Sequence, residues 1–227
     1  MSVRVARVLG GRFTVLTLSL VLLSMAGTTI ESRDVRDFAV GLAFSVLLVF
    51  AILSVGRRVR IVTVTFAVPT LLAHWLLWHG ELAAYRYIDF ALTSAFLAFL
   101  TLVIIVAVFN DQAVTADTIV GAVCAYFLIG LTWGTVYALL VIVSPDSLSV
   151  SPALARASGW GDAFTPFTPL LLYYSFTTLA TLGYGDVTPL SAGARNLSVL
   201  EGLTGQLYLA VLVARLVGIH TARAPRA

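Results

Sequence analysis

Six long apolar runs are separated by short polar connections along the chain. They cover residues 13–30, 38–55, 61–78, 87–109, 118–143 and 196–218. Each run can cross the hydrocarbon core of a bilayer as a helix, which takes about 20 residues. Helix is the expected structure, because backbone groups in lipid must pair within their own segment. The alternation typical of a membrane barrel is not seen.

A further apolar stretch, residues 170–180, is too short to cross a bilayer. It follows Pro169, and the first turn of a helix tolerates proline. It lies between the fifth and sixth long runs and leads into a glycine-rich turn. Non-helical backbone at membrane depth must be buried in protein or line a water-filled cavity. The pattern therefore predicts a short re-entrant helix that returns through an irregular loop.

Composition supports a membrane protein. Of 227 residues, 59% are apolar and 11% are charged, less than half the charged share of a soluble domain. A soluble enzyme of this size cannot bury so much apolar surface, and the spans contain no hydrolase motif, so no enzyme is expected. No basic run is interleaved with aromatic residues, so nucleic acid is not an expected partner. The single cysteine, Cys124, excludes a disulfide within one chain.

Arginine placement predicts the orientation. With the N-terminus inside, the inner segments carry eight arginines and two acids, and the outer segments carry five arginines and seven acids. Because positive charge is enriched on the cytoplasmic side, we expect both termini in the cytoplasm and the chain in the plasma (inner) membrane. The first run has an alternative interpretation as a signal peptide, with cleavage after residues 1–26. Cleavage would not alter the orientation of the rest.

The candidate chemistry lies in a turn that reads Thr181-Leu182-Gly183-Tyr184-Gly185-Asp186. Its two glycines alternate with other residues, and glycine takes positive φ at little cost. Alternating left- and right-handed residues turn successive carbonyls toward one side, which forms a row of oxygens. Several such rows around an axis can replace the water shell of a hard cation. The hydroxyl of Thr181 offers a further oxygen.

This turn resembles the filter signature of the potassium channel family, which usually reads Thr-Val-Gly-Tyr-Gly-Asp. The resemblance extends over residues 118–218 and includes a downstream proline, Pro189, and a downstream span. It implies an all-α membrane protein with six transmembrane helices, and with a re-entrant pore helix and a selectivity-filter loop between spans five and six. It also implies a homotetramer in membrane lipid, with the pore on the four-fold axis.

The same resemblance assigns roles to the residues of the turn. The permeant ion is expected to be K+, with no other cofactor. The implied K+ ligands are the carbonyls of Thr181, Leu182, Gly183 and Tyr184 and the hydroxyl of Thr181, with Gly185 completing the filter. The resemblance places Asp186 at the outer mouth as an anchor and makes the ring of Tyr184 a brace.

Two positions depart from the family pattern, because Leu182 replaces valine and Ala180 replaces a common threonine. Leu182 keeps its carbonyl, but its different branching changes the packing behind the filter. We therefore expect a potassium-selective channel and keep a weakly selective monovalent cation channel as an alternative. A membrane subunit of a potassium transport system is a second alternative, although such proteins usually carry four degenerate loops in one chain.

The chain divides into residues 1–110, a four-span N-terminal membrane domain, and residues 111–227, the pore domain. The N-terminal domain has the position of a voltage sensor, but residues 87–109 contain no basic residue and one charge, Asp89. Voltage sensors need regularly spaced basic residues, so the channel is not expected to be classically voltage-gated. Asp89 is interpreted as an anchor of the helix bundle rather than as a proton sensor.

Three residues of the last span are candidates for gating or for the cavity. Gly205 is either a hinge or a site of close helix packing, because glycine weakens a helix by about 1 kcal/mol and also admits a neighbour. Gln206 is expected to face the cavity. Glu201 is costly inside a span, so we expect it behind the filter, bonded to pore-helix hydroxyls such as Thr177 or Thr178. A place near the outer interface is the alternative.

Overall fold

The computed structural model describes residues 12–29, 33–54, 57–76, 83–110, 115–158, 160 and 169–222. Long helices occur at each of the six predicted runs. They are α2 (Arg12–Thr29), α3 (Arg33–Ser54), α4 (Arg57–Leu76), α5 (Ala83–Asn110), α6 (Ala116–Val143) and α9 (Ala192–Ala222). The predicted short helix is α8 (Pro169–Leu179). The two ends of the chain, with Arg4, Arg7, Arg223 and Arg226 of the arginines used for orientation, lie outside the described residues. The possible cleavage site lies within α2, and cleavage there stays a prediction.

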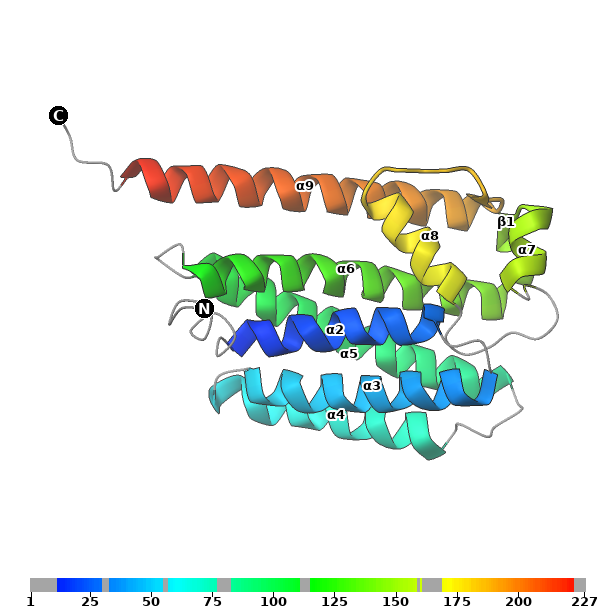
Figure 1. Ribbon diagram of the computed structural model, residues 1–227, viewed down its shortest axis with the longest axis horizontal. Helices are drawn as coiled ribbons and strands as arrows, with labels where there is room; N and C mark the ends of the chain where they lie inside the picture. Colours follow the sequence, from blue (N-terminus) through cyan, green and yellow to red (C-terminus); the bar gives the residue numbers. More distant parts are fainter. Residues whose placement is uncertain are drawn as a thin grey trace.

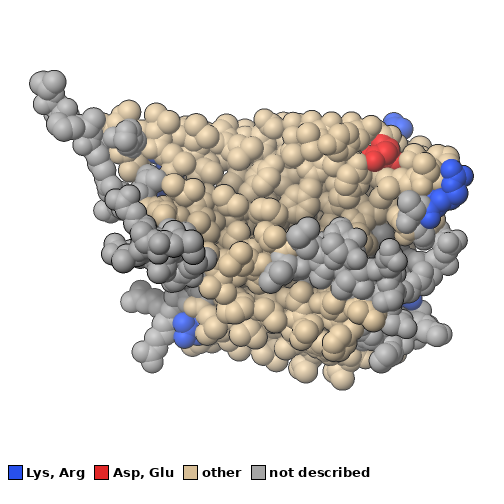
Figure 2. All heavy atoms as spheres, viewed as in Figure 1, with Lys and Arg blue, Asp and Glu red and all other residues tan. Residues whose placement is uncertain are grey.

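Four helices of the described part are long and apolar enough to cross a membrane. Their apolar spans are Val59–Leu76, Ala84–Asn110, Ala116–Val143 and Ala192–Ile219, and α3 contributes the shorter apolar stretch Phe38–Leu53. On the face shown in Figure 2, the described charged side chains lie toward the two ends of the molecule, and the surface between them is uncharged. The chain is therefore a mostly helical membrane protein, as its sequence predicts.

The long helices pack side by side, with α6 in the middle of the arrangement (Figure 1). On one side α6 contacts α5 and α2, which in turn contact α4 and α3. On the other side α8 crosses obliquely between α6 and α9 (Figure 1). The first turn of α2 and the last turn of α9 lie at the same end (Figure 1). The N-terminal helices therefore pack directly on the outer helix of the candidate pore region.

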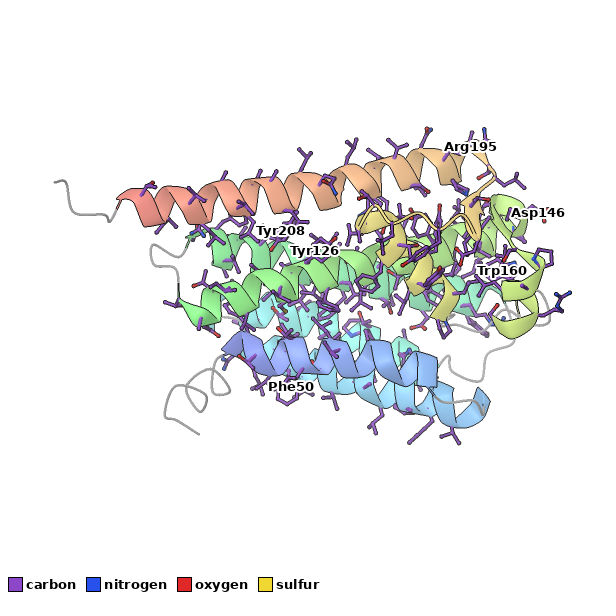
Figure 3. The ribbon with its side chains drawn as sticks, turned by 45° about the horizontal axis from the view of Figure 1, so that its top comes forward. Phe50, Tyr126, Asp146, Trp160, Arg195 and Tyr208 are labelled. Carbon is purple, nitrogen blue, oxygen red and sulfur yellow. The ribbon has the colours of Figure 1, made fainter. Side chains whose placement is uncertain are left out.

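Hydroxyl pairs and close contacts join these helices. Ser94 of α5 donates to Thr135 of α6 over 2.8 Å, and Tyr208 of α9 donates to the carbonyl of Ala122 in α6 over 2.7 Å. Interhelical hydrogen bonds of this kind hold membrane helices together where the hydrophobic effect does not. Figure 3 shows Tyr208 next to Tyr126 of α6, away from the end that holds Asp146, Trp160 and Arg195.

Three glycines of α6 admit side chains from other helices. A Cβ at Gly121 would lie 2.8 Å from the ring of Phe13 in α2, and one at Gly134 would lie 2.6 Å from Leu172 in α8. At Gly130 a Cβ would overlap the ring of Phe176 in α8. Through these glycines α6 therefore packs closely against both α2 and α8. The largest buried apolar cluster likewise runs from Phe13 through α6 to Leu179 and Tyr208. The division into domains at residue 110 stays a prediction.

The first residues of α6, α8 and α9 follow local sequence rules for helix ends. The side chain of Thr115 accepts from the N–H of Thr118 at the start of α6, and Ser191 accepts from the N–H of Ala194 at the start of α9. Such N-caps satisfy backbone groups that have no partner inside the helix. Pro169 occupies the first position of α8, as predicted.

Two short strands, which an all-α prediction omits, lie beside the turn. After α6 come a 3-10 turn η1 (Pro145–Ser147), strand β1 (Leu148–Val150) and a short helix α7 (Pro152–Ser158). Strand β2 (Val187–Pro189) pairs antiparallel with β1, with Ser149 opposite Thr188. The segment that leaves the glycine-rich turn is therefore bonded to the segment that leaves α6.

Candidate functional site

The glycine-rich turn after α8 alternates in backbone handedness. Residues with positive φ occur at every second position, namely Thr181 (57°), Gly183 (52°) and Gly185 (81°). Positive φ is a genuine outlier for a β-branched residue, so Thr181 is held in a costly conformation by its surroundings. The alternation that the two glycines predicted is present, and it begins two residues before the first glycine, at Thr181.

The C-terminal end of α8 holds the start of this turn. The carbonyl of Thr177 accepts from the N–H of Leu182 (2.8 Å) and from the N–H of Gly183 (3.3 Å). The N–H of Thr181 donates to the carbonyl of Thr178 over 3.0 Å. These bonds use carbonyls that have no partner inside the helix. They fix the entry of the turn and impose the left-handed conformation on Thr181.

The carbonyls of residues 181–185 receive no hydrogen bond from any described residue. The side chains of Leu182 and Tyr184 are 57% and 67% exposed. Unpaired backbone acceptors are not tolerated against lipid, so this segment must be covered by protein or face water. Carbonyl oxygens that accept no hydrogen bond are also the kind of ligand that a hard cation requires.

The C-terminal end of the turn is held by hydrogen bonds of Asp186. Its Oδ2 accepts from the hydroxyl of Tyr173 in α8 over 2.6 Å, and its Oδ1 accepts from the N–H of Val187 over 3.0 Å. Its carbonyl accepts from the N–H of Ser151 over 2.8 Å. The hydrogen bond to Asp186, with a smaller effect of burial, raises the pKa of Tyr173 to about 12. The ring of Tyr184 stacks on that of Tyr173, with centroids 6.3 Å apart.

Glu201 lies behind α8 and is fully buried. The expected bond to a hydroxyl of α8 is present, but the expected partners are wrong. Glu201 contacts the hydroxyls of Ser175 (2.5 Å) and of Tyr137 in α6 (2.7 Å). Thr177 instead donates to the carbonyl of Tyr174, one turn back in its own helix. The alternative place near the outer interface does not fit a side chain with no exposed surface.

Gly205 is held in a close contact between helices. A Cβ at this position would overlap the carbonyl oxygen of Leu179, the last residue of α8. Of the two interpretations of Gly205, this geometry favours packing over a hinge. The next residue, Gln206, is exposed on the open face of α9. Toward the C-terminal end of that helix, Arg215 lies 5.2 Å above the ring of Phe109 in α5.

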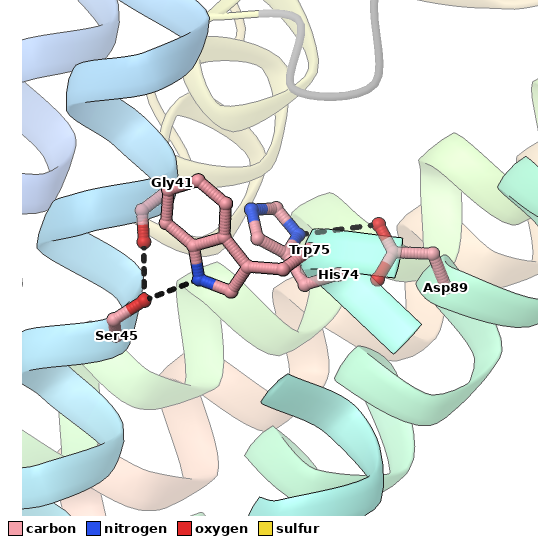
Figure 4. A network of polar contacts seen from close by, with 5 residues as sticks. All are labelled: Gly41, Ser45, His74, Trp75 and Asp89. Atoms are coloured by element: carbon pink, nitrogen blue, oxygen red, sulfur yellow. Dashed lines mark hydrogen bonds and ion pairs between the residues drawn. The ribbon is translucent and has the colours of Figure 1, made fainter. Parts of the chain in front are cut away.

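A second polar cluster lies among the N-terminal helices, far in sequence from the turn (Figure 4). Nδ1 of His74 in α4 lies 3.4 Å from Oδ2 of Asp89 in α5. The indole N–H of Trp75 donates to the hydroxyl of Ser45 in α3 over 3.0 Å. These contacts join three helices, which fits the interpretation of Asp89 as an anchor. No group of three or more metal-binding side chains occurs among the described residues.

A short helix, α8, thus lies between two long helices and leads into a turn of alternating handedness whose carbonyls have no donor among the described residues. Residues 125–221 match a family model described as an ion channel. Over this part of the chain, the resemblance to the potassium channel family is confirmed. The remaining helices, α2 to α5, lie outside the matched range.

One curated relative adds little to the family match. Over 46 residues the chain is 48% identical to Protein LctB of Bacillus caldotenax. The similarity covers 20% of this chain and 34% of that protein, so the chain spans about a third of the relative's length. No solved structure matches the chain.

Proposed function

We propose that four copies of this chain form a potassium-selective channel that conducts K+ passively through the carbonyls of residues 181–185. In this proposal α8 is the re-entrant pore helix, and α2 to α6 and α9 are the six spans. Both termini are cytoplasmic and the membrane is the plasma (inner) membrane. The channel is not classically voltage-gated, because residues 87–109 carry no basic residue.

The observation that carries the proposal is the alternation of positive φ at Thr181, Gly183 and Gly185. It occurs in a segment whose carbonyls have no donor among the described residues. Peptide oxygens in such a row can replace the hydration shell of a monovalent cation. The strain at Thr181 supports a functional role, since costly conformations persist where the mechanism needs them.

The proposed tetramer is supported by the surface of α9. Only 11% of the apolar span of α9 is buried, against 50% of the span of α6. Leu203 and Leu207 of α9 and Leu182 of the turn are all more than half exposed. Each chain has one pore loop, so several chains must meet for rows of oxygens to surround an ion. In that assembly Gln206 faces the cavity.

The departure at Leu182 favours one specific alternative. A weakly selective monovalent cation channel would keep the carbonyl row but lose the fixed spacing between opposite rows. A membrane subunit of a potassium transport system is the second alternative, and it would need a partner protein for transport.

Ion flux from liposomes that contain the purified full chain tests the proposal. We expect passive K+ flux and a reversal potential that follows the K+ gradient in mixed K+ and Na+. The loss-of-function variant is Gly185→Ala, because alanine at a φ of 81° costs about 1–2 kcal/mol. The matched control is Gly218→Ala, since a Cβ at Gly218, as at Gly185, meets no atom within 4 Å.

Each outcome has a defined meaning. Equal permeability to K+ and Na+ indicates the weakly selective channel. K+ transport only after addition of a partner protein indicates the transport subunit. A folded wild-type protein without flux, or equal flux in Gly185→Ala and the wild type, contradicts the channel. Cross-linking of the liposome sample must show four chains, and any other number contradicts the four-fold pore.

A further inference from the structure

Glu201 belongs to a chain of short contacts between oxygen atoms that joins α6, α8 and α9. One carboxyl oxygen lies 2.7 Å from the hydroxyl of Tyr137, and the other lies 2.5 Å from the hydroxyl of Ser175. The Ser175 hydroxyl also lies 2.7 Å from the carbonyl oxygen of Gly130. Three helices therefore meet at one carboxyl group.

A second set of contacts runs beside the first. The hydroxyl of Tyr174 lies 2.6 Å from that of Ser198, which lies 2.8 Å from the carbonyl oxygen of Ala194. The hydroxyls of Tyr137 and Ser198 are 3.5 Å apart. Because the distance from the Tyr137 hydroxyl to Glu201 is much shorter, Tyr137 donates its hydrogen bond to the carboxyl group of Glu201 and not to Ser198.

Counting hydrogens fixes the state of the carboxyl group. Each hydroxyl carries one hydrogen, and a carbonyl oxygen accepts only. Tyr174 donates to Ser198, Ser198 donates to Ala194, and Tyr137 donates to Glu201. The two remaining short contacts, from Ser175 to Gly130 and from Ser175 to Glu201, share one hydroxyl hydrogen. An ionised carboxylate accepts only, so one of these contacts would join two oxygens without a hydrogen.

The surroundings of Glu201 also disfavour a charge. An ionised carboxylate that is fully buried needs a cation or several donors to offset the loss of water. No Arg or His among the described residues forms an ion pair with Glu201. The titratable side chain bonded to it is Tyr137 of α6, and Tyr174 of α8 bonds to Ser198 beside it. None of these is positively charged.

We propose that Glu201 is a neutral carboxylic acid that donates its hydrogen to Ser175, which donates in turn to the carbonyl of Gly130. With this assignment, each of the five short contacts has one hydrogen. Glu201 is then a positioning residue, because it ties the pore helix α8 to α6 and α9 without placing a charge behind the turn. Its consequence for ion flow rests on the proposed function, whereas its chemical state does not.

Infrared spectroscopy of the full chain in liposomes near neutral pH tests this state. The wild type should show the carbonyl stretch of a protonated carboxylic acid, shifted in D2O, and Glu201→Gln should lack it. The control Asp146→Asn removes an exposed acid and should keep the band. In Ser175→Ala the band should persist at higher frequency, because its hydrogen-bond acceptor is gone. If Glu201→Gln removes carboxylate bands instead, the proposal is wrong.

Stability gives a second measurement. Glutamine is a close substitute for the neutral acid, since its amide donates to Ser175 and its carbonyl accepts from Tyr137. Glu201→Gln should therefore unfold with the wild type, and Glu201→Ala should unfold under milder conditions. A Glu201→Gln protein that fails to fold would show that an anion is required. A wild type with the acid band but without K+ flux would contradict the proposed function and leave this inference standing.

Discussion

Replacing Gly205 with alanine separates the two interpretations of this glycine. If Gly205 is a hinge, alanine should stabilise α9, because glycine weakens a helix by about 1 kcal/mol. If Gly205 is a packing site, the added methyl group must displace the end of α8. The methyl carbon would overlap the carbonyl oxygen of Leu179 and lie 3.0 Å from its side chain, and backbone at this end of α8 cannot move freely because it also holds the turn.

The expected magnitude follows from two opposing terms. Forcing an extra carbon into a packed site costs about 1–3 kcal/mol, and the gain in helix propensity offsets about 1 kcal/mol of it. We therefore expect Gly205→Ala to lower the free energy of unfolding by up to about 2 kcal/mol. Gly218→Ala is the matched control in the same helix, because a Cβ there meets no atom within 4 Å, so only the gain applies.

The assay is the unfolding midpoint of purified protein in one detergent, measured for the wild type and both variants. The free energies of Gly205→Ala and Gly218→Ala should differ by about 1–3 kcal/mol, with Gly205→Ala the less stable. Gly202→Ala is a further variant in the same helix with an intermediate distance to α8. Its Cβ would lie 3.8 Å from the carbonyl oxygen of Thr178, an ordinary contact. If Gly205→Ala is as stable as Gly218→Ala, the packing interpretation is refuted and the hinge is favoured.

Two further predictions concern the contacts of α8. The raised pKa of Tyr173, about 12, means that its bond to Asp186 contributes fully below about pH 10 and is lost as pH rises through about 12. Tyr173→Phe should therefore cost about 1 kcal/mol at neutral pH and abolish the extra alkaline destabilisation of the wild type. Unfolding midpoints of the wild type and Tyr173→Phe at neutral pH and at a pH of about 12 check this. Equal midpoints of the two proteins at neutral pH would contradict it. Gly130→Ala should destabilise the protein by overlap with Phe176, and Phe176→Leu should restore stability in the double variant. A double variant no better than Gly130→Ala would exclude this contact as the cause.

The long helices could be predicted because each is a run of apolar residues with polar ends, and lipid leaves the backbone no other solution. The handedness of the turn was predictable at Gly183 and Gly185, since glycine favours positive φ. It was not predictable at Thr181, where three hydrogen bonds to the end of α8 override the preference of the side chain. The strands at Leu148–Val150 and Val187–Pro189 were missed because three residues carry no periodic signal.

The partners of Glu201 show a different limit of the sequence. A buried acid in a span predicts a hydrogen-bonding partner, and α8 does supply one, Ser175. Which hydroxyl reaches it depends on the rotation of α8 about its axis, which Gly130 and Gly134 of α6 fix by admitting Phe176 and Leu172. The sequence does not indicate this role for Tyr137, because Tyr137 lies in an apolar helix, α6, that packs against α8 and α9 from a distant part of the sequence.

Three glycines of α6 make that helix a shared packing surface for α2 and α8, which lie on different sides of it. Phe13 engages it at Gly121, and Phe176 and Leu172 engage it at Gly130 and Gly134. A displacement or rotation of α6 must therefore move α2 and α8 together. A displacement of α2 can therefore reach α8, and with it the start of the glycine-rich turn, through α6 alone.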